Sequence, residues 1–251
     1  MQPVLIEKAP ASIMIKLSAN PFQLPKEIRN HHDHFWNEQI NNNPTLRNGE
    51  VFTITESKQT PEKLEITVAR TDYKHYLYTM QHPACDHPCK VIYSCASILT
   101  KDNYMAFGRM SQTTSTPGRL QFAGGGLEER DVRDSIFEME ENMKRELQEE
   151  MGVLVHSPST RSFLPKFIKR KGSHDFWAVI YELTMDYTAN ELHDHFLHHN
   201  QSIRESGKQP EFDQLLLVPL EKEAVQSFIQ KEQASMVDYL TPILKKYTEG
   251  N

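Results

Sequence analysis

Apolar residues recur at helical spacing near the middle of the chain. In the stretch 133–153, Ile136, Met139, Met143 and Leu147 follow one another at intervals of three and four. Residues at this spacing lie on one stripe of an α-helix. The pattern therefore predicts a helix over 133–153 with one face in a core.

The rest of the chain is predicted to form mainly short strands, with helices toward both ends. Alternation or short apolar runs predict strands at 12–17, 51–55, 64–70, 91–99, 104–110, 120–123, 163–170, 176–183 and 211–220. Helices are expected at 25–41, 189–198, 221–231 and 233–247, and 73–80 forms a further short element. This order of sheet, helix, sheet and terminal helices predicts an α/β fold, an α/β/α sandwich.

A stretch rich in proline, cysteine and histidine at 82–89 suggests a joint between two units. We expect residues 1–88 to form an N-terminal α+β extension and residues 89–251 to form the main domain. The main domain should keep a folded core without the extension.

Three glutamates share one face at the end of the central helix. Glu146, Glu149 and Glu150 stand at positions i, i+3 and i+4, and Glu150 borders the apolar stripe. Carboxylates crowded beside buried surface repel one another unless protons or a hard cation compensate them. The alternative is a solvated acidic face paired with Lys144 and Arg145.

A glycine-rich segment precedes this helix. The apolar strand 120–123 runs into Gly124, Gly125 and Gly126. Glycines allow backbone to approach a phosphate or metal closely, and a loop that enters a helix offers free amide donors. The same three glycines could also form an ordinary turn.

Together, the segment 120–128 and the run Arg-Glu-Leu-Gln-Glu-Glu-Met-Gly-Val at 145–153 resemble the signature of the Nudix hydrolases. Members of this family cleave nucleoside diphosphates linked to another moiety. The resemblance implies a mixed sheet inside the α/β/α sandwich and a divalent cofactor, Mg²⁺ or Mn²⁺. It also implies a small-molecule nucleoside diphosphate derivative as the substrate.

The resemblance assigns roles to individual residues. The metal ligands would be Glu146, Glu149 and Glu150, with the Gly125 carbonyl as a further ligand. Glu146 would also belong to the catalytic set with Arg145. The arginine would orient the glutamates through an ion pair with an acid of the 128–131 stretch.

The chain departs from the family pattern at several positions. Twenty positions separate Gly125 from Arg145, six more than in the pattern, and Ala123 stands where proline is common. Asp131 is the nearest acid to the first glutamate of the motif. We expect the extra residues, within 131–142, to form a longer or two-part entry to the helix. The expanded motif, the long extension and the stretch 43–49 resemble, more weakly, the UDP-sugar pyrophosphatase branch.

A general base must be sought outside the motif. The polar stretch 200–210 is expected to be a loop long enough to close over a ligand. Glu211 ends this stretch just before a strand, so we take it as the candidate catalytic base, with Asp213 and Glu205 as alternatives. A solvated loop carboxylate is the competing interpretation.

The composition of the chain limits the classes of partner that we expect it to bind. The chain has 251 residues and a formal net charge of -6, which gives no general attraction to nucleic acid. Its longest apolar runs fall short of the roughly 20 residues that span a bilayer, so we expect no membrane partner. No export signal is evident, and a cytoplasmic location is expected. The oligomeric state stays open, a homodimer being one option.

The cysteines and histidines offer a second place for a metal. Cys85, His87 and Cys89 could supply zinc ligands, but no second cysteine pair follows, and loop thiols are the preferred interpretation. Cys95 is expected in the core. The remaining histidine groups, 31, 32 and 34 in one predicted helix and 193, 195, 198 and 199 in another, are expected to be polar helix residues.

Two functions are compatible with these observations. The first is a metal-dependent hydrolase that cleaves the pyrophosphate bond of a nucleoside diphosphate linked to another moiety, a nucleotide sugar being one case. The second is a nucleotide-binding or regulatory module of the same fold that turns over weakly.

Overall fold

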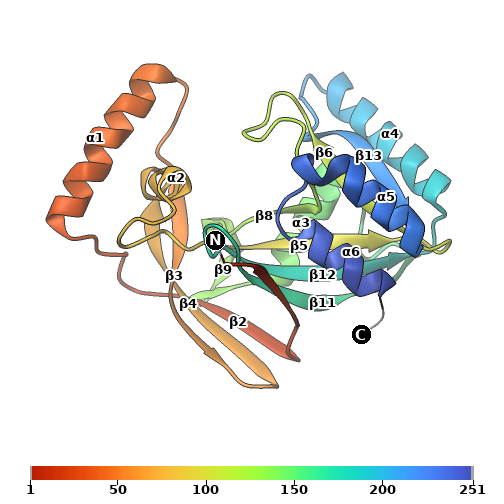
Figure 1. Ribbon diagram of the computed structural model, residues 1–251, viewed down its shortest axis with the longest axis horizontal. Coiled ribbons are helices and arrows are strands. Elements are labelled where there is room, and N and C mark those ends of the chain that lie inside the picture. Colours follow the sequence, from red (N-terminus) through yellow and green to blue (C-terminus); the bar gives the residue numbers. More distant parts are fainter. Residues whose placement is uncertain (1, 250–251) are drawn as a thin grey trace.

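A computed structural model describes residues 2–249, which form two sheets flanked by helices (Figure 1). The main sheet has the order β1-β11-β12-β5-β6-β13, with β7 paired to β6 and β8 paired to β5. Its strands are β1 Val4–Lys8, β5 Ile92–Leu99, β6 Tyr104–Met110, β7 Leu120–Gln121, β8 Ala123–Gly126, β11 Thr160–Lys171, β12 Trp177–Met185 and β13 Phe212–Pro219. Strands β12 and β5 run parallel, whereas the other pairings are antiparallel. The sheet is therefore mixed, as predicted.

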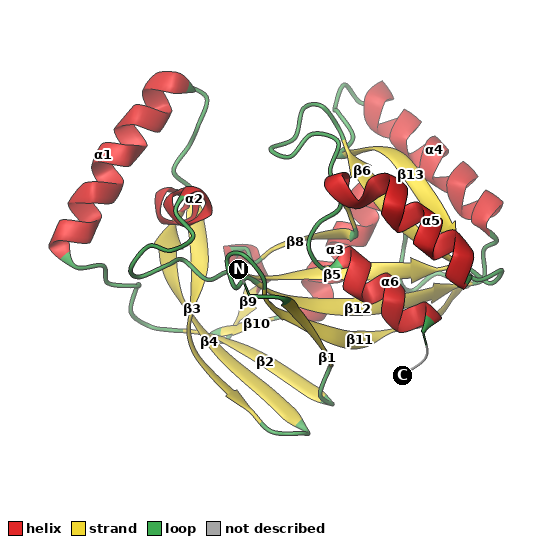
Figure 2. Cartoon of the chain, viewed as in Figure 1, coloured by secondary structure: helices red, strands yellow, loops and turns green. Residues whose placement is uncertain are grey.

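Helices cover both faces of this sheet (Figure 2). On one face lie α3 (Met139–Met151) and α4 (Ala189–Glu205), which bury Met143, Leu147 and Phe196. On the other face lie α5 (Lys222–Glu232) and α6 (Leu240–Thr248), which bury Val225 and Leu240. The predicted α/β/α sandwich is confirmed. None of the described helices combines the length and apolarity needed to cross a membrane.

The second sheet lies to one side of the sandwich and has the order β3-β4-β2-β10-β9. Its strands are β2 Ser12–Leu17, β3 Glu50–Gln59, β4 Lys63–Asp72, β9 Val132–Arg133 and β10 Ile136–Phe137, and two helices, α1 Lys26–Asn42 and α2 Tyr73–Gln81, accompany it. The Phe52 and Phe137 rings meet edge to face, with centroids 4.9 Å apart. Both rings belong to the same apolar cluster as the α3 stripe.

Strand pairing crosses residue 88 in both directions. Strand β1 pairs with β11 of the main sheet, and β10 pairs with β2 of the second sheet. The division into 1–88 and 89–251 stays a prediction. Each sheet contains strands from both segments, and the two segments also share an apolar core.

The predicted helix over 133–153 is wrong in its first part. Residues 132–137 form the hairpin β9–β10, and α3 begins only at Met139. Asp134 and Ser135 between the two strands both have positive φ, 49° and 66°, as in the tight turns that join antiparallel strands. The residues inserted into the motif therefore extend the second sheet instead of lengthening the entry to the helix.

Two further helix boundaries differ from prediction. Helix α4 continues to Glu205, so most of the predicted loop 200–210 is helical. Its capping box at Thr188 and Glu191 fixes the start, while Asn200 is buried and donates to the Phe212 carbonyl. The last helix begins at Leu240 instead of 233, after a short 3₁₀ turn at Gln233–Ser235.

Three histidines are not simply polar surface residues. His32 is fully buried between α1 and α2. His195 Nε2 donates to the Gly152 carbonyl and His199 Nε2 to the Glu149 carbonyl, both at 2.9 Å. The last carbonyls of a helix lack partners within the helix, so α4 helps to terminate α3.

Candidate functional site

The glycine-rich strand β8 lies directly against the acidic end of α3. The Gly124 N–H donates to Glu150 Oε2 at 2.8 Å. A Cβ atom at Gly125 would lie 2.6 Å from the carboxyl carbon of Glu146, which is closer than van der Waals contact allows. Glycine at 125 therefore lets the Glu146 carboxylate press against the strand, and this arrangement joins the two halves of the sequence motif.

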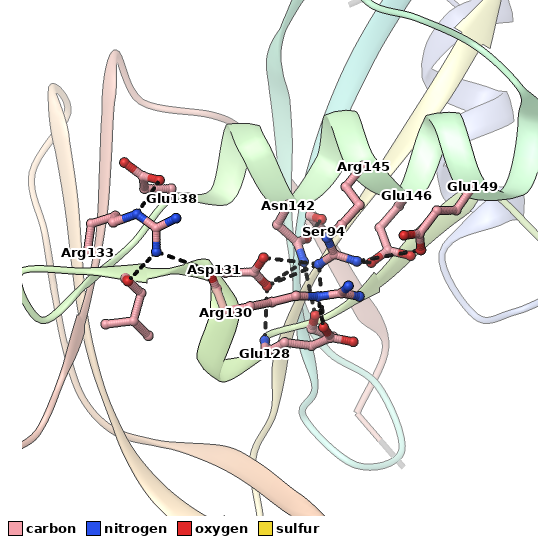
Figure 3. A network of polar contacts seen from close by, with 12 residues as sticks. Ser94, Glu128, Arg130, Asp131, Arg133, Glu138, Asn142, Arg145, Glu146 and Glu149 are labelled. Carbon is pink, nitrogen blue, oxygen red and sulfur yellow. Dashed lines mark hydrogen bonds and ion pairs between the residues drawn. The ribbon is translucent and has the colours of Figure 1, made fainter.

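Arg145 sits at the centre of a polar network (Figure 3). Its Nη1 donates to Glu146 Oε1 at 2.6 Å, and its Nη2 donates to Asp131 Oδ1 at 3.0 Å. Glu149 and Glu128 lie farther from the guanidinium, at 3.7 and 3.8 Å. The expected ion pair between Arg145 and an acid of the 128–131 stretch is present, and Asp131 is its principal member.

Asn142 is a member of this network that the sequence did not reveal. The buried amide donates to Asp131 Oδ2 at 2.8 Å and to the Gly126 carbonyl at 3.2 Å. Its Oδ1 accepts from Ser94 Oγ at 2.5 Å. A signal was available, because Asn142 stands four residues before Glu146 and so shares its helix face.

The carboxylates of the site differ in environment. Burial, followed by the like charge of Glu211, raises the pKa of Glu150 well above its usual value. Burial also raises the pKa of Glu146, although Arg145 opposes the shift. The Glu149 side chain is 54% exposed. The site thus contains two buried carboxylates and a third that reaches solvent.

The structure separates the candidates for the general base. Glu211 lies beside Glu150 and lines a cavity with Gly124 and Gly125. Asp213 is exposed and does not line this cavity. Glu205 lies in the last turn of α4 and hydrogen-bonds Gln201. Of the three, only Glu211 belongs to the same site as the motif.

The donors of this site suit a hard divalent cation. Glu150 and Glu211 carry like charges that raise the pKa of Glu150, and an oxygen-seeking cation would relieve this repulsion. Within residues 2–249, no three side chains of His, Cys, Asp or Glu are already grouped as metal ligands. The Gly125 carbonyl and substrate oxygens would therefore complete a coordination shell, as Mg²⁺ commonly requires.

The cavity beside these residues has a volume of about 620 Å³ and lies between the two sheets. Its acidic lining residues are Glu50, Glu128 and Glu211, and Gly124, Gly125 and Gly126 also line it. Aromatic and basic side chains from both segments of the chain also line it, namely Tyr73, Tyr76, Tyr93, Arg119, Lys169, His174 and Phe176. No pattern in the sequence indicated that the N-terminal segment would form a wall of this cavity.

No family model matches the chain, and no curated protein matches it. Among solved structures, the MutT protein from Methanosarcina mazei Go1 is similar at 14% identity and a TM-score of 0.39, over 64% of this chain and 94% of that one. A bifunctional NMN adenylyltransferase/ADP ribose pyrophosphatase from Francisella tularensis, complexed with AMP and Mn ion, is similar at 10% identity and a TM-score of 0.41, over 68% of this chain and 44% of that one. The NUDIX domain of NrtR from Shewanella oneidensis, complexed with ADP ribose, is similar at 13% identity and a TM-score of 0.38, over 68% of this chain and 96% of that one. The run at 145–153 resembles the Nudix signature, and a NUDIX domain is among the solved structures that the chain matches.

Proposed function

We propose that this protein is a metal-dependent hydrolase that cleaves the pyrophosphate bond of a nucleoside diphosphate linked to another moiety. The observation that carries the proposal is the convergence of Glu146, Glu150 and Glu211 on the glycines of β8, which line the cavity together with Glu211. A site for pyrophosphate hydrolysis needs oxygen ligands for a cation, room for phosphates and an acid near the attacking water. Under the proposal, Glu146 and Glu150 provide the oxygen ligands, the cavity holds the phosphates and Glu211 is the acid.

The residues that would hold Mg²⁺ or Mn²⁺ are Glu146, Glu149, Glu150 and the Gly125 carbonyl. A bound divalent ion supplies charge neutralisation at the phosphates and lowers the pKa of water. Arg145 is a positioning residue, because it holds Glu146 on one side and Asp131 on the other. Asn142 also donates to the Asp131 carboxylate and helps to fix it.

Glu211 is proposed as the general base that accepts a proton from the attacking water. Glu211→Gln keeps the shape of the side chain but removes the basic oxygen, so kcat should fall by roughly 100-fold or more while KM changes little. Asp213→Asn is the matched control, since that carboxylate does not line the cavity. Equal rates for Glu211→Gln and the wild type would move the role to another acid.

The proposal is tested with a panel of nucleoside diphosphate compounds, including nucleotide sugars and dinucleotides. Each compound is incubated with the protein and either Mg²⁺ or a chelator, and the phosphorylated products are separated by anion-exchange chromatography. We expect one class of compound to give two monophosphate products, and only when metal is present. A panel that stays intact with both Mg²⁺ and Mn²⁺ would refute the proposal.

The second candidate function is a nucleotide-binding or regulatory module. The direct bond from Arg145 Nη1 to Glu146 Oε1, 2.6 Å long, favours it, because that carboxylate is already engaged by a cation. Tight binding of a panel compound without turnover, measured by isothermal titration calorimetry beside the product assay, would establish this function instead.

A further inference from the structure

An aromatic surface lines the cavity that Glu211 and the glycines of β8 also line. Tyr76, on α2, and Phe176, just before β12, stack with ring centroids 5.5 Å apart and planes 25° apart. His174 continues the surface, with its ring centroid 5.2 Å from that of Phe176. All three rings line the cavity. Segments far apart in the sequence thus build one stacking surface.

A positively charged side chain, Arg119, lines the same cavity as the aromatic surface. Two cationic groups, Arg119 and Lys169, line the cavity. Lys169 is buried and occupied, because its Nζ donates to the Phe176 carbonyl at 2.8 Å and pairs with Asp238 at 3.1 Å. The Arg119 guanidinium is half-buried, and no hydrogen bond or ion pair joins it to another residue between 2 and 249. It is therefore available to an anionic ligand.

The aromatic rings and Arg119 suit a different part of a substrate from the part that the carboxylates suit. Aromatic side chains stack with any nucleobase, because every base has a flat π face. Guanidinium groups form paired hydrogen bonds with phosphate. A sugar without aromatic character would gain little from stacked rings. The carboxylates of the site repel phosphates unless a cation is bound, whereas Arg119 attracts them directly.

We propose that Tyr76, Phe176 and Arg119 form a nucleotide subsite, in which the base stacks on the aromatic surface and the adjoining phosphate contacts Arg119. The inference rests on the proposed function and adds to it the position of the base. Helix α2 then contributes directly to substrate recognition, so the N-terminal segment is part of the binding site and holds the base.

The test measures binding without divalent metal, so that hydrolysis does not enter. Isothermal titration calorimetry compares AMP, GMP, CMP and UMP with ribose 5-phosphate, which carries the sugar and phosphate but no base. At least one nucleotide should bind more tightly than ribose 5-phosphate. Tyr76→Leu should weaken that nucleotide roughly 5- to 150-fold, the range expected for one lost stacking contact, and should leave ribose 5-phosphate unchanged. Arg119→Gln should weaken both kinds of ligand.

Three further variants separate stacking from folding. Tyr76→Trp keeps an aromatic face and should retain binding. Tyr78→Leu is the control on the same helix, because Tyr78 packs against His32 and Phe35 and does not line the cavity. Arg204→Gln is the control for loss of a positive charge at a position outside the cavity. Thermal melting of each variant establishes that it is folded.

Two results would overturn the inference. One is equal affinity for ribose 5-phosphate and all four nucleotides, including no binding of any. The other is wild-type nucleotide affinity in both folded Tyr76→Leu and folded Arg119→Gln. Nucleotide binding that obeys these expectations in a protein without hydrolase activity would refute the proposed function and leave the subsite in place.

Discussion

At the scale of single residues, the contact between Gly125 and Glu146 sets the geometry of the candidate site. The carboxylate occupies the space that any side chain at 125 would need. A Cβ atom at neighbouring Gly126 would have no other atom within 4 Å, so the two glycines face different surroundings. The sequence, with three consecutive glycines at 124–126, does not reveal this difference between Gly125 and Gly126.

This difference gives a paired prediction. Gly125→Ala should reduce the hydrolysis rate on the order of 100-fold, because the added methyl group displaces the Glu146 carboxylate by a fraction of an ångström or more. Gly126→Ala should stay near the wild-type rate. Steady-state kinetics with Mg²⁺ measures both, and equal effects of the two substitutions would contradict the assigned geometry.

Part of the site was predictable from residue types and spacing. The helix face shared by Glu146, Glu149 and Glu150 follows from positions i, i+3 and i+4, whereas the partner of Arg145 in 128–131 was implied by the resemblance to the Nudix family. The arrangement around Asn142 and the exposure of Glu149 depend on which strand packs against the helix, and periodicity does not contain that information.

At the scale of elements, the packing of α1 against α2 buries a histidine without hydrogen bonds. His32 is fully buried, and neither ring nitrogen has a partner within residues 2–249. Burial, with a smaller contribution from His75, lowers its pKa from 6.5 to about 4. The neutral ring packs against Tyr78 at a centroid distance of 4.1 Å.

This burial predicts a dependence of stability on pH. Between pH 6.5 and 4 the unfolded chain binds a proton at His32 and the folded chain does not, so the free energy of unfolding falls as the pH falls. The contribution is complete above pH 6.5, and its loss by pH 4 is on the order of 2 to 3 kcal/mol. Urea unfolding across this range should show the slope.

The variants His32→Phe and His34→Phe test its origin. His32→Phe should flatten the slope, because the new ring cannot take up a proton. His34 is exposed and pairs with Glu38, so its replacement should leave the slope unchanged. An unaltered slope in His32→Phe would assign the effect to other groups.

Helices and strands with a single clear period were predicted well, and errors arose where two patterns coincide. Ile136 fits the apolar stripe of α3 but lies in β10, since the Asp134–Ser135 turn reverses the chain. The polar residues of 200–205 suggested a loop, but they form the solvent-facing end of α4, which Asn200 ties to the sheet.

At the scale of the whole molecule, the two sheets share one apolar core. Phe52 and Ile66 of the second sheet belong to the same cluster as Met143 and Leu147 of α3, and β1 covers the edge of β11. These long-range contacts could not be foreseen from composition, which only suggested a joint near residue 88.

The shared core predicts the outcome of truncation. A fragment of residues 89–251 should aggregate or unfold non-cooperatively, because Phe137 and the edge of β11 lose their partners. Size-exclusion chromatography and thermal melting of the fragment check this expectation. A monomeric fragment with a cooperative transition would show that the main domain is independent, as the sequence suggested.

The central claim is that the carboxylates of α3 bind a metal used in hydrolysis. Its most direct test is the rate of product release as a function of Mg²⁺ concentration for the wild type, Glu150→Gln and the control Glu205→Gln. Glutamine at 150 can still accept the hydrogen bond from the Gly124 N–H but loses the charge, so we expect turnover to fall by orders of magnitude. Glu205→Gln should match the wild type. Wild-type Mg²⁺-dependent turnover in folded Glu150→Gln would contradict the account.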